Sequence, residues 1–330
     1  YCTRATADLL QVMLNDAAGL YERDLERENL RRSRRGAPEL QPAYTRADVE
    51  RVFKQCSPQR YRQPFAIGEA GSVTFHDAGH ILGSAIVELT LQEQGREKRL
   101  VFSGDLGKKD SVLLFDPDVL TRADVVMMEG TYGDRDHRTL GNTLEQFEQV
   151  LSEAWERGGN VMIPAFAVGR TQELLFYLGQ LHQQGKLDNW EIFLDSPMAI
   201  EVTRLYDRWL SQLDCEGAKG LCSGDQTLLR DFLPRLRLTA STDESMMINK
   251  IKRGALIIAG SGMCTGGRIR HHFKQRIWDE RNTLIFVGYQ ARNTLGRILV
   301  DGVKRIKLFR EEYLVRAQIE TLGGFSAHAG

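Results

Sequence analysis

Cysteine is scarce in this sequence. Its 330 residues contain five cysteines, an odd number, at Cys2, Cys56, Cys215, Cys222 and Cys264. A set this small excludes a disulfide framework and is typical of reduced thiols in a cytoplasm. Cys215 and Cys222 stand seven positions apart, which is not the spacing of a zinc finger, so any metal chemistry has to come from other side chains.

Net charge and long apolar runs are also absent. Lys+Arg and Asp+Glu both number 44, so nucleic-acid binding has to come from local basic patches and not from overall charge. No run of 18 apolar residues occurs and the N-terminus is not signal-like, which predicts a cytoplasmic protein that does not bind a membrane. The apolar content of 42% is that of an ordinary globular protein, and the length allows two domains.

The N-terminal part of the chain predicts helices followed by a sheet. Apolar residues at helical spacing predict a long helix from Ala5 to Arg31, and Thr45 is expected to cap a second helix through Phe53. Short apolar runs then predict strands near residues 72–76, 84–91, 98–103 and 124–128. We expect these strands to be antiparallel, as one sheet of a sandwich.

From about residue 140 the pattern changes to repeated strand–loop–helix units. Strands are expected at residues 160–163, 191–194, 255–258 and 283–287, each followed by a loop and a helix. Such repeats predict a parallel sheet flanked by helices, whose loops at the carboxyl ends of the strands share one edge where ligands bind. The candidate substrate-binding residues in those loops are Arg170, Ser196, Ser261 and Arg268.

The loop at residues 260–267 is rich in glycine and has two interpretations. It precedes a predicted helix, so its backbone N–H groups could hold a phosphate, with Arg268 and Arg270 nearby. A structural turn is the alternative. The loop is not a P-loop, because no Lys-Ser/Thr pair follows the last glycine.

Four polar residues stand where predicted strands give way to glycine-containing loops: His80, Asp105, Glu129 and His328. Two imidazoles and two carboxylates are the side chains used for metal binding and proton transfer. Each of the four also has a simpler interpretation, such as a hydrogen-bonded loop histidine, a capping aspartate or a solvent-facing glutamate. The sequence around these residues is therefore needed to decide whether they form a functional site or have structural roles.

That surrounding sequence resembles a known family. Eight motifs occur in the order found in β-CASP nucleases of the metallo-β-lactamase fold, and together they span nearly the whole chain: GHILGS, FSGDLG, EGTYGDR, IPAFAVGR, DSPMA, AGSGMCTGGRIRHH, VGYQARNTLGR and GGFSAHAG. The resemblance implies an α/β fold in three parts. A metallo-β-lactamase αββα sandwich, incomplete at both ends, would cover residues 1–136. An inserted β-CASP domain, a parallel sheet flanked by helices, would cover residues 137–318. Residues 319–330 would return to the first domain.

The resemblance also implies roles for the four polar residues. His80 and Asp105 match zinc ligands, with Asp105 bridging two metals, and the complete protein is expected to hold two Zn²⁺. Glu129 matches the acidic motif A, and His328 matches the motif B histidine that handles protons at the scissile phosphate. Asp105, Glu129 and His328 are thus the predicted catalytic set. RNA is the implied partner, and the oligomeric state stays open, a homodimer included.

Two departures from the family pattern affect these predictions. The metal motif His-x-His-x-Asp-His is absent, since no histidine precedes His76, and a further ligand histidine would lie beyond Gly330. We interpret the chain as an internal segment of a longer metal-dependent ribonuclease, in which two zincs activate the water that hydrolyses RNA, and expect the segment alone to be inactive. The alternatives are a catalytically inactive RNA-binding or scaffold paralogue, and a metallo-hydrolase of a small molecule. The sequence does not distinguish endonuclease from 5′-exonuclease action.

Overall fold

The structure is a computed structural model that describes residues 1–69, 71–133, 140–210 and 232–329. The chain divides into two compact units. The first contains residues 1–77, 83–104 and 119–127, and the second contains residues 78–82, 105–118 and 128–330. Cys215, Cys222 and the predicted domain limit at 136/137 lie outside the described residues, and the predicted domain limits stay predictions.

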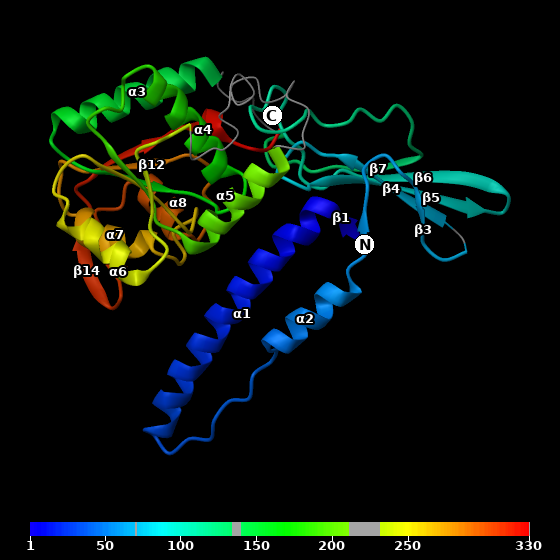
Figure 1. The fold of residues 1–330 in the computed structure, drawn as a ribbon, viewed down its shortest axis with the longest axis horizontal. Helices are drawn as coiled ribbons and strands as arrows, with labels where there is room; N and C mark the ends of the chain where they lie inside the picture. Colours follow the sequence, from blue (N-terminus) through cyan, green and yellow to red (C-terminus); the bar gives the residue numbers. More distant parts are fainter. Residues whose placement is uncertain (70, 134–139, 211–231, 330) are drawn as a thin grey trace. The chain divides into compact units, whose positions relative to one another are not determined.

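The first unit begins with a helical hairpin (Figure 1) made of α1 (Arg4–Ser33) and α2 (Arg46–Gln55), both close to their predicted bounds. The predicted cap is present: the backbone N–H and the hydroxyl of Thr45 both donate to the Asp48 carboxylate. Tyr21 and Tyr44 stack with ring centroids 4.7 Å apart, which ties α1 to the segment that leads into α2. At the base of the hairpin, β1 (Cys2–Thr3) pairs in parallel with β2 (Pro58–Gln59).

A five-stranded sheet completes the first unit. Its order is β3 (Phe65–Ala66), β4 (Gly71–Asp77), β5 (Ala85–Glu93), β6 (Arg96–Phe102) and β7 (Val125–Met127). The strands β4, β5 and β6 are antiparallel as predicted, and β3, which was not predicted, pairs antiparallel with β4. The prediction was wrong for β7, which runs parallel to β6 because the long connection from Phe102 to Val125 returns the chain to the same end of the sheet.

The second unit contains a six-stranded sheet in which every strand is parallel to its neighbours. Its order is β10 (Leu236–Leu238), β9 (Glu191–Leu194), β11 (Ala255–Ala259), β8 (Val161–Pro164), β12 (Thr283–Phe286) and β15 (Gln318–Thr321). The four predicted strands form its centre, while β10 and β15 were not foreseen. The predicted α/β class with a parallel sheet is confirmed.

Helices and one hairpin accompany this sheet. The α-helices are α3 (Leu140–Glu156), α4 (Arg170–Gln183), α5 (Pro197–Leu210), α6 (Thr242–Met247), α7 (Ile269–Arg276) and α8 (Leu295–Val300). The described residues of this unit also form two 3₁₀ turns, η1 (Ile248–Lys250) and η2 (Gly323–Phe325), and the hairpin β13 (Arg305–Leu308)–β14 (Glu311–Leu314). Among the described residues, no helix has both the length and the apolar character needed to cross a membrane.

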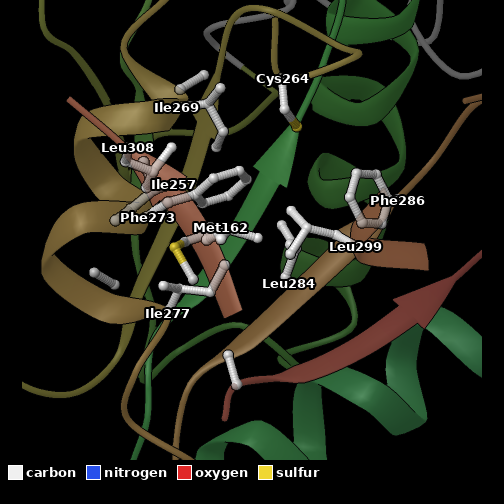
Figure 2. Close-up of a cluster of buried hydrophobic side chains, with 14 of the residues drawn as sticks. Met162, Ile257, Cys264, Ile269, Phe273, Ile277, Leu284, Phe286, Leu299 and Leu308 are labelled. Atoms are coloured by element: carbon white, nitrogen blue, oxygen red, sulfur yellow. The ribbon is translucent and has the colours of Figure 1, made fainter. Parts of the chain in front are cut away.

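The central strands are buried on both faces, as the continuous apolar runs predicted. Every residue of β11 is buried, and Met162, Ile257 and Leu284 are fully enclosed. Figure 2 shows these side chains packed against Phe273 of α7. Burying one such side chain stabilises the fold by about 1.5–3 kcal/mol. The sheet therefore provides a rigid base for the loops at its carboxyl edge.

Candidate metal centre

Three of the predicted site residues gather at one place in the second unit. The metal-binding atoms of His80, Asp105 and His328 all lie within 4.8 Å of one another. His80 Nε2 is 3.8 Å from Asp105 Oδ2, and the rings of His80 and His328 have centroids 4.5 Å apart. Within the described part of the chain, this is the one group of three or more His, Cys, Asp or Glu side chains close enough to share an ion.

Glycine makes this assembly possible. The Gly107 N–H donates to the carbonyl of Ala78 at 2.7 Å, and Gly107 forms an antiparallel bridge with His328. A Cβ atom at position 107 would lie 1.8 Å from the carbonyl oxygen of Gly79, so no other residue fits there without movement. The close backbone approach brings the loops that carry His80, Asp105 and His328 together.

Glu129 holds His328 from the side of Nδ1. The two carboxylate oxygens lie 3.1 and 3.2 Å from His328 Nδ1, and one of them accepts the N–H of Leu106 at 2.5 Å. A carboxylate only accepts, so Nδ1 carries a proton and Nε2 is the nitrogen that serves as base or ligand. Burial alone raises the Glu129 pKa, but hydrogen bonds from Thr131, Leu106 and His328 outweigh it and the net pKa is lowered. Glu129 is therefore an ionised group that orients His328.

His80 is set up as a neutral imidazole. Its side chain is only 11% exposed, and this burial, together with repulsion from His328, lowers its pKa despite the nearby Asp105 carboxylate. Neutral imidazole is the form that binds metal ions. Asp105 is 62% exposed, so the third donor faces solvent.

The donor set fits one metal ion. Two imidazoles and one carboxylate are a ligand combination found at catalytic zinc sites, which keep a position for water. A second ion would need donors beyond these three. The sequence predicted His80 and Asp105 as ligands and His328 as a proton donor outside the metal shell, and the grouping places His328 as close as the ligands. These roles stay predictions.

Arg268, a predicted phosphate contact, is bound to the protein itself. One guanidinium nitrogen donates to Asp195 Oδ1 at 2.7 Å and to the Thr239 carbonyl at 2.8 Å, and the other donates to the Ala240 carbonyl at 2.7 Å. These bonds tie α7 to the ends of β9 and β10. The side chain is 20% exposed, so part of it still faces outward, and its role toward phosphate stays a prediction.

The other predicted substrate residues lie at the same sheet edge and are likewise bonded internally. Arg170 is buried in an ion pair with Glu173. Ser196 is buried, and its hydroxyl accepts the N–H of Ala199 at 3.3 Å in the first turn of α5. The Ser261 hydroxyl accepts the Gly266 N–H at 3.2 Å within the glycine-rich loop, which favours the structural-turn interpretation of that loop.

Asp195 is the main residue that sequence reasoning missed. It is fully buried at the end of β9, and it accepts hydrogen bonds from His272 Nε2 at 2.6 Å, Ser245 at 2.6 Å and Thr239 at 2.8 Å, besides that of Arg268. Burial raises its pKa, but these donors and the charge of His272 outweigh the burial and bring the pKa to about 2. An aspartate followed by Ser-Pro at a strand end was visible in the sequence, but the identity of its partners was not.

The two adjacent histidines of α7 point to different faces of the helix, as predicted for neighbouring residues. His272 is buried against Asp195, while the ring of His271 stacks on Phe309 at 4.6 Å. They cannot line one site, because neighbouring residues on a helix point to different faces.

Comparison with known proteins identifies relatives along the whole chain. The Beta-Casp domain family matches residues 171–299. "Ribonuclease TTHA0252" of Thermus thermophilus is 37% identical over 332 residues, which cover 100% of this chain and 70% of the relative. An "RNase J-like protein" of Methanocaldococcus jannaschii is 30% identical over 331 residues, covering 99% of this chain and 70% of the relative.

A longer relative shares the same region. "Transcription termination factor FttA" of Methanocaldococcus jannaschii is 32% identical over 339 residues. This alignment covers 100% of the present chain but only 50% of that protein. The chain therefore corresponds to a part of each of these relatives.

Proposed function

Because this chain belongs to the β-CASP family of metallo-β-lactamase-fold ribonucleases, we propose that the natural protein hydrolyses RNA phosphodiester bonds at a zinc centre that includes His80 and Asp105. The observation that carries this proposal is the group of His80, Asp105, Glu129 and His328, which comes from separate segments of the chain. A scaffold that had lost its chemistry would have no need to hold two histidines and two carboxylates together.

Each residue has a defined part in the proposed reaction. His80 and Asp105 would hold the metal ion. A zinc ion bound there would supply positive charge beside the scissile phosphate and lower the pKa of a bound water. His328 gives a proton to the leaving ribose oxygen, as a general acid does. Glu129 accepts the hydrogen bond from His328 Nδ1 and thereby orients its ring.

The carboxyl edge of the six-stranded sheet is the proposed path of the RNA. The residues that we assign to binding the phosphates of the RNA, without reading its bases, belong to this edge: Arg170, Ser196, Ser261 and Arg268. Their internal bonds fix the loops in which they stand. The domain limits 1–136, 137–318 and 319–330 belong to the same proposal.

The test compares the natural full-length protein with the 330-residue chain. Elemental analysis and cleavage of a labelled RNA should give two zincs and cleavage for the former, and less metal and no cleavage for the latter. His76→Ala is a matched control, because His76 pairs with Glu88 at 2.8 Å in the five-stranded sheet of the other unit. Light scattering on the same sample measures the number of copies.

Other outcomes favour the alternatives. A natural protein that binds RNA but neither holds zinc nor cuts would be a scaffold paralogue. Hydrolysis of a thioester or lactam without cleavage of RNA would assign the centre to a small molecule.

A further inference from the structure

A row of aromatic rings leads away from the candidate metal centre. The ring of Tyr132 lies 6.2 Å from that of His328 and 6.3 Å from that of Tyr289, with Tyr132 and Tyr289 nearly perpendicular at 82°. Tyr289 is 48% exposed, and Phe166, at 44%, is exposed to a similar degree. Tyr132 is half-buried, so Tyr289 and Phe166 are the two exposed rings of this group. Exposed aromatic rings beside a reactive site are candidates for binding a ligand.

The sheet topology places these rings along one edge. Phe166 follows the end of β8 by two residues, and Tyr289 follows the end of β12 by three. Strands β8 and β12 are paired in parallel, and β12 pairs with β15, which leads to His328. The carboxyl edge therefore presents Phe166, Tyr289 and His328 in the order of the strands.

The loops that carry Phe166 and Tyr289 both contact Gly262 of the glycine-rich loop. The buried side chain of Gln290 donates to the Gly262 carbonyl at 3.0 Å. A Cβ at Gly262 would lie 2.7 Å from the ring of Phe166, so the ring rests directly on that glycine. These contacts hold the aromatic loops in place before any ligand binds, which lowers the entropy cost of binding.

We propose that Tyr289, together with Tyr132 and Phe166, forms a platform on which unpaired RNA bases stack as the strand reaches the metal centre. The inference rests on the proposed ribonuclease function and adds the side chains that would hold the bases. Every base has a flat π face, so stacking accepts any sequence, but it requires bases that are not paired. The platform thus selects single-stranded RNA, and it positions the phosphate that follows the stacked base.

The protein offers a matched control for this idea. Trp278 is 50% exposed, but it lies between α7 and β12, at the amino edge of the same sheet. Replacing it removes as much exposed aromatic surface without touching the proposed platform. Tyr289→Phe keeps the ring and removes only the hydroxyl.

The experiment measures cleavage and binding of a single-stranded RNA by the zinc-loaded full-length protein and its variants. Tyr289→Ala should weaken RNA binding and raise KM by about tenfold, since stacking contributes about 5- to 150-fold per base. Tyr289→Phe and Trp278→Ala should stay near the wild-type value, and the zinc content should be unchanged in all three.

An abasic RNA makes the test specific. One ribonucleotide without a base is moved through the positions flanking the cleavage site. At the stacked position the abasic RNA should bind the wild-type protein about tenfold more weakly, and Tyr289→Ala should cause no further loss.

If RNA is cut but Tyr289→Ala behaves like Trp278→Ala, or its effect is equal at every abasic position, the platform does not exist. Equal cleavage of duplex and single-stranded RNA would also overturn it. Failure of the wild-type protein to cut any RNA would instead refute the proposed function.

Discussion

Replacing Asp195 with asparagine tests the buried network that joins β9 to α7. The carboxylate is fully buried and accepts from Arg268, His272, Ser245 and Thr239. Asparagine keeps the shape but removes the charge, and its amide group turns one acceptor into a donor that faces other donors. The variant should therefore fold into the same structure with lower stability.

The size of the effect follows from the pKa of Asp195. Its pKa is lowered from 3.8 to about 2 in the folded protein. One pKa unit corresponds to about 1.4 kcal/mol, so the ionised form contributes on the order of 2–3 kcal/mol to the free energy of unfolding at neutral pH. Because the folded-state pKa lies below the unfolded one, the unfolded chain takes up the proton first on acidification. The contribution is complete above about pH 5 and is lost as the pH falls from about 4 to about 2.

Urea denaturation between pH 7 and pH 2.5 measures this contribution. At pH 7, the free energy of unfolding of Asp195→Asn should be lower than that of the wild type by about 2–3 kcal/mol, and this difference should shrink below pH 4. Asp301→Asn is the control, because Asp301 is 53% exposed in an i,i+4 pair with Arg297 and should change stability by less than about 0.5 kcal/mol. Equal stability at pH 7, or a gap that does not change with pH, would refute the reasoning.

Two further predictions concern the candidate centre. His328→Ala in the full-length protein should lower turnover by about two to four orders of magnitude with zinc content unchanged. Loss of zinc from this variant would make His328 a ligand. Gly107→Ala should destabilise the chain by about 3 kcal/mol in the same denaturation assay, because its Cβ would lie 1.8 Å from the Gly79 carbonyl oxygen, whereas Gly141→Ala, with open space around it, should be neutral or better. Equal behaviour of the two glycine variants would contradict the close-approach argument.

The sequence by itself determined the elements whose signals are local. The helix over Arg4–Ser33, the cap at Thr45 and the four central strands of the parallel sheet all follow from apolar spacing and capping chemistry within a few residues. The family motifs also singled out His80, Asp105, Glu129 and His328 as one set, although these residues stand far apart in the chain. Such patterns are readable because they depend on short-range backbone geometry and on side-chain types that a reaction requires.

The tertiary structure alone decided the direction of the strands and the bonding partners of the side chains. The parallel course of β7 and the addition of β10 and β15 to the sheet depend on where long connections return, which no local pattern records. For the same reason, the sequence did not show that Arg268 is bonded to Asp195, 73 residues earlier in the chain. The free energy of such a pair comes from burial and from a neighbour supplied by another element, and both exist only once the sheet and its helices have assembled.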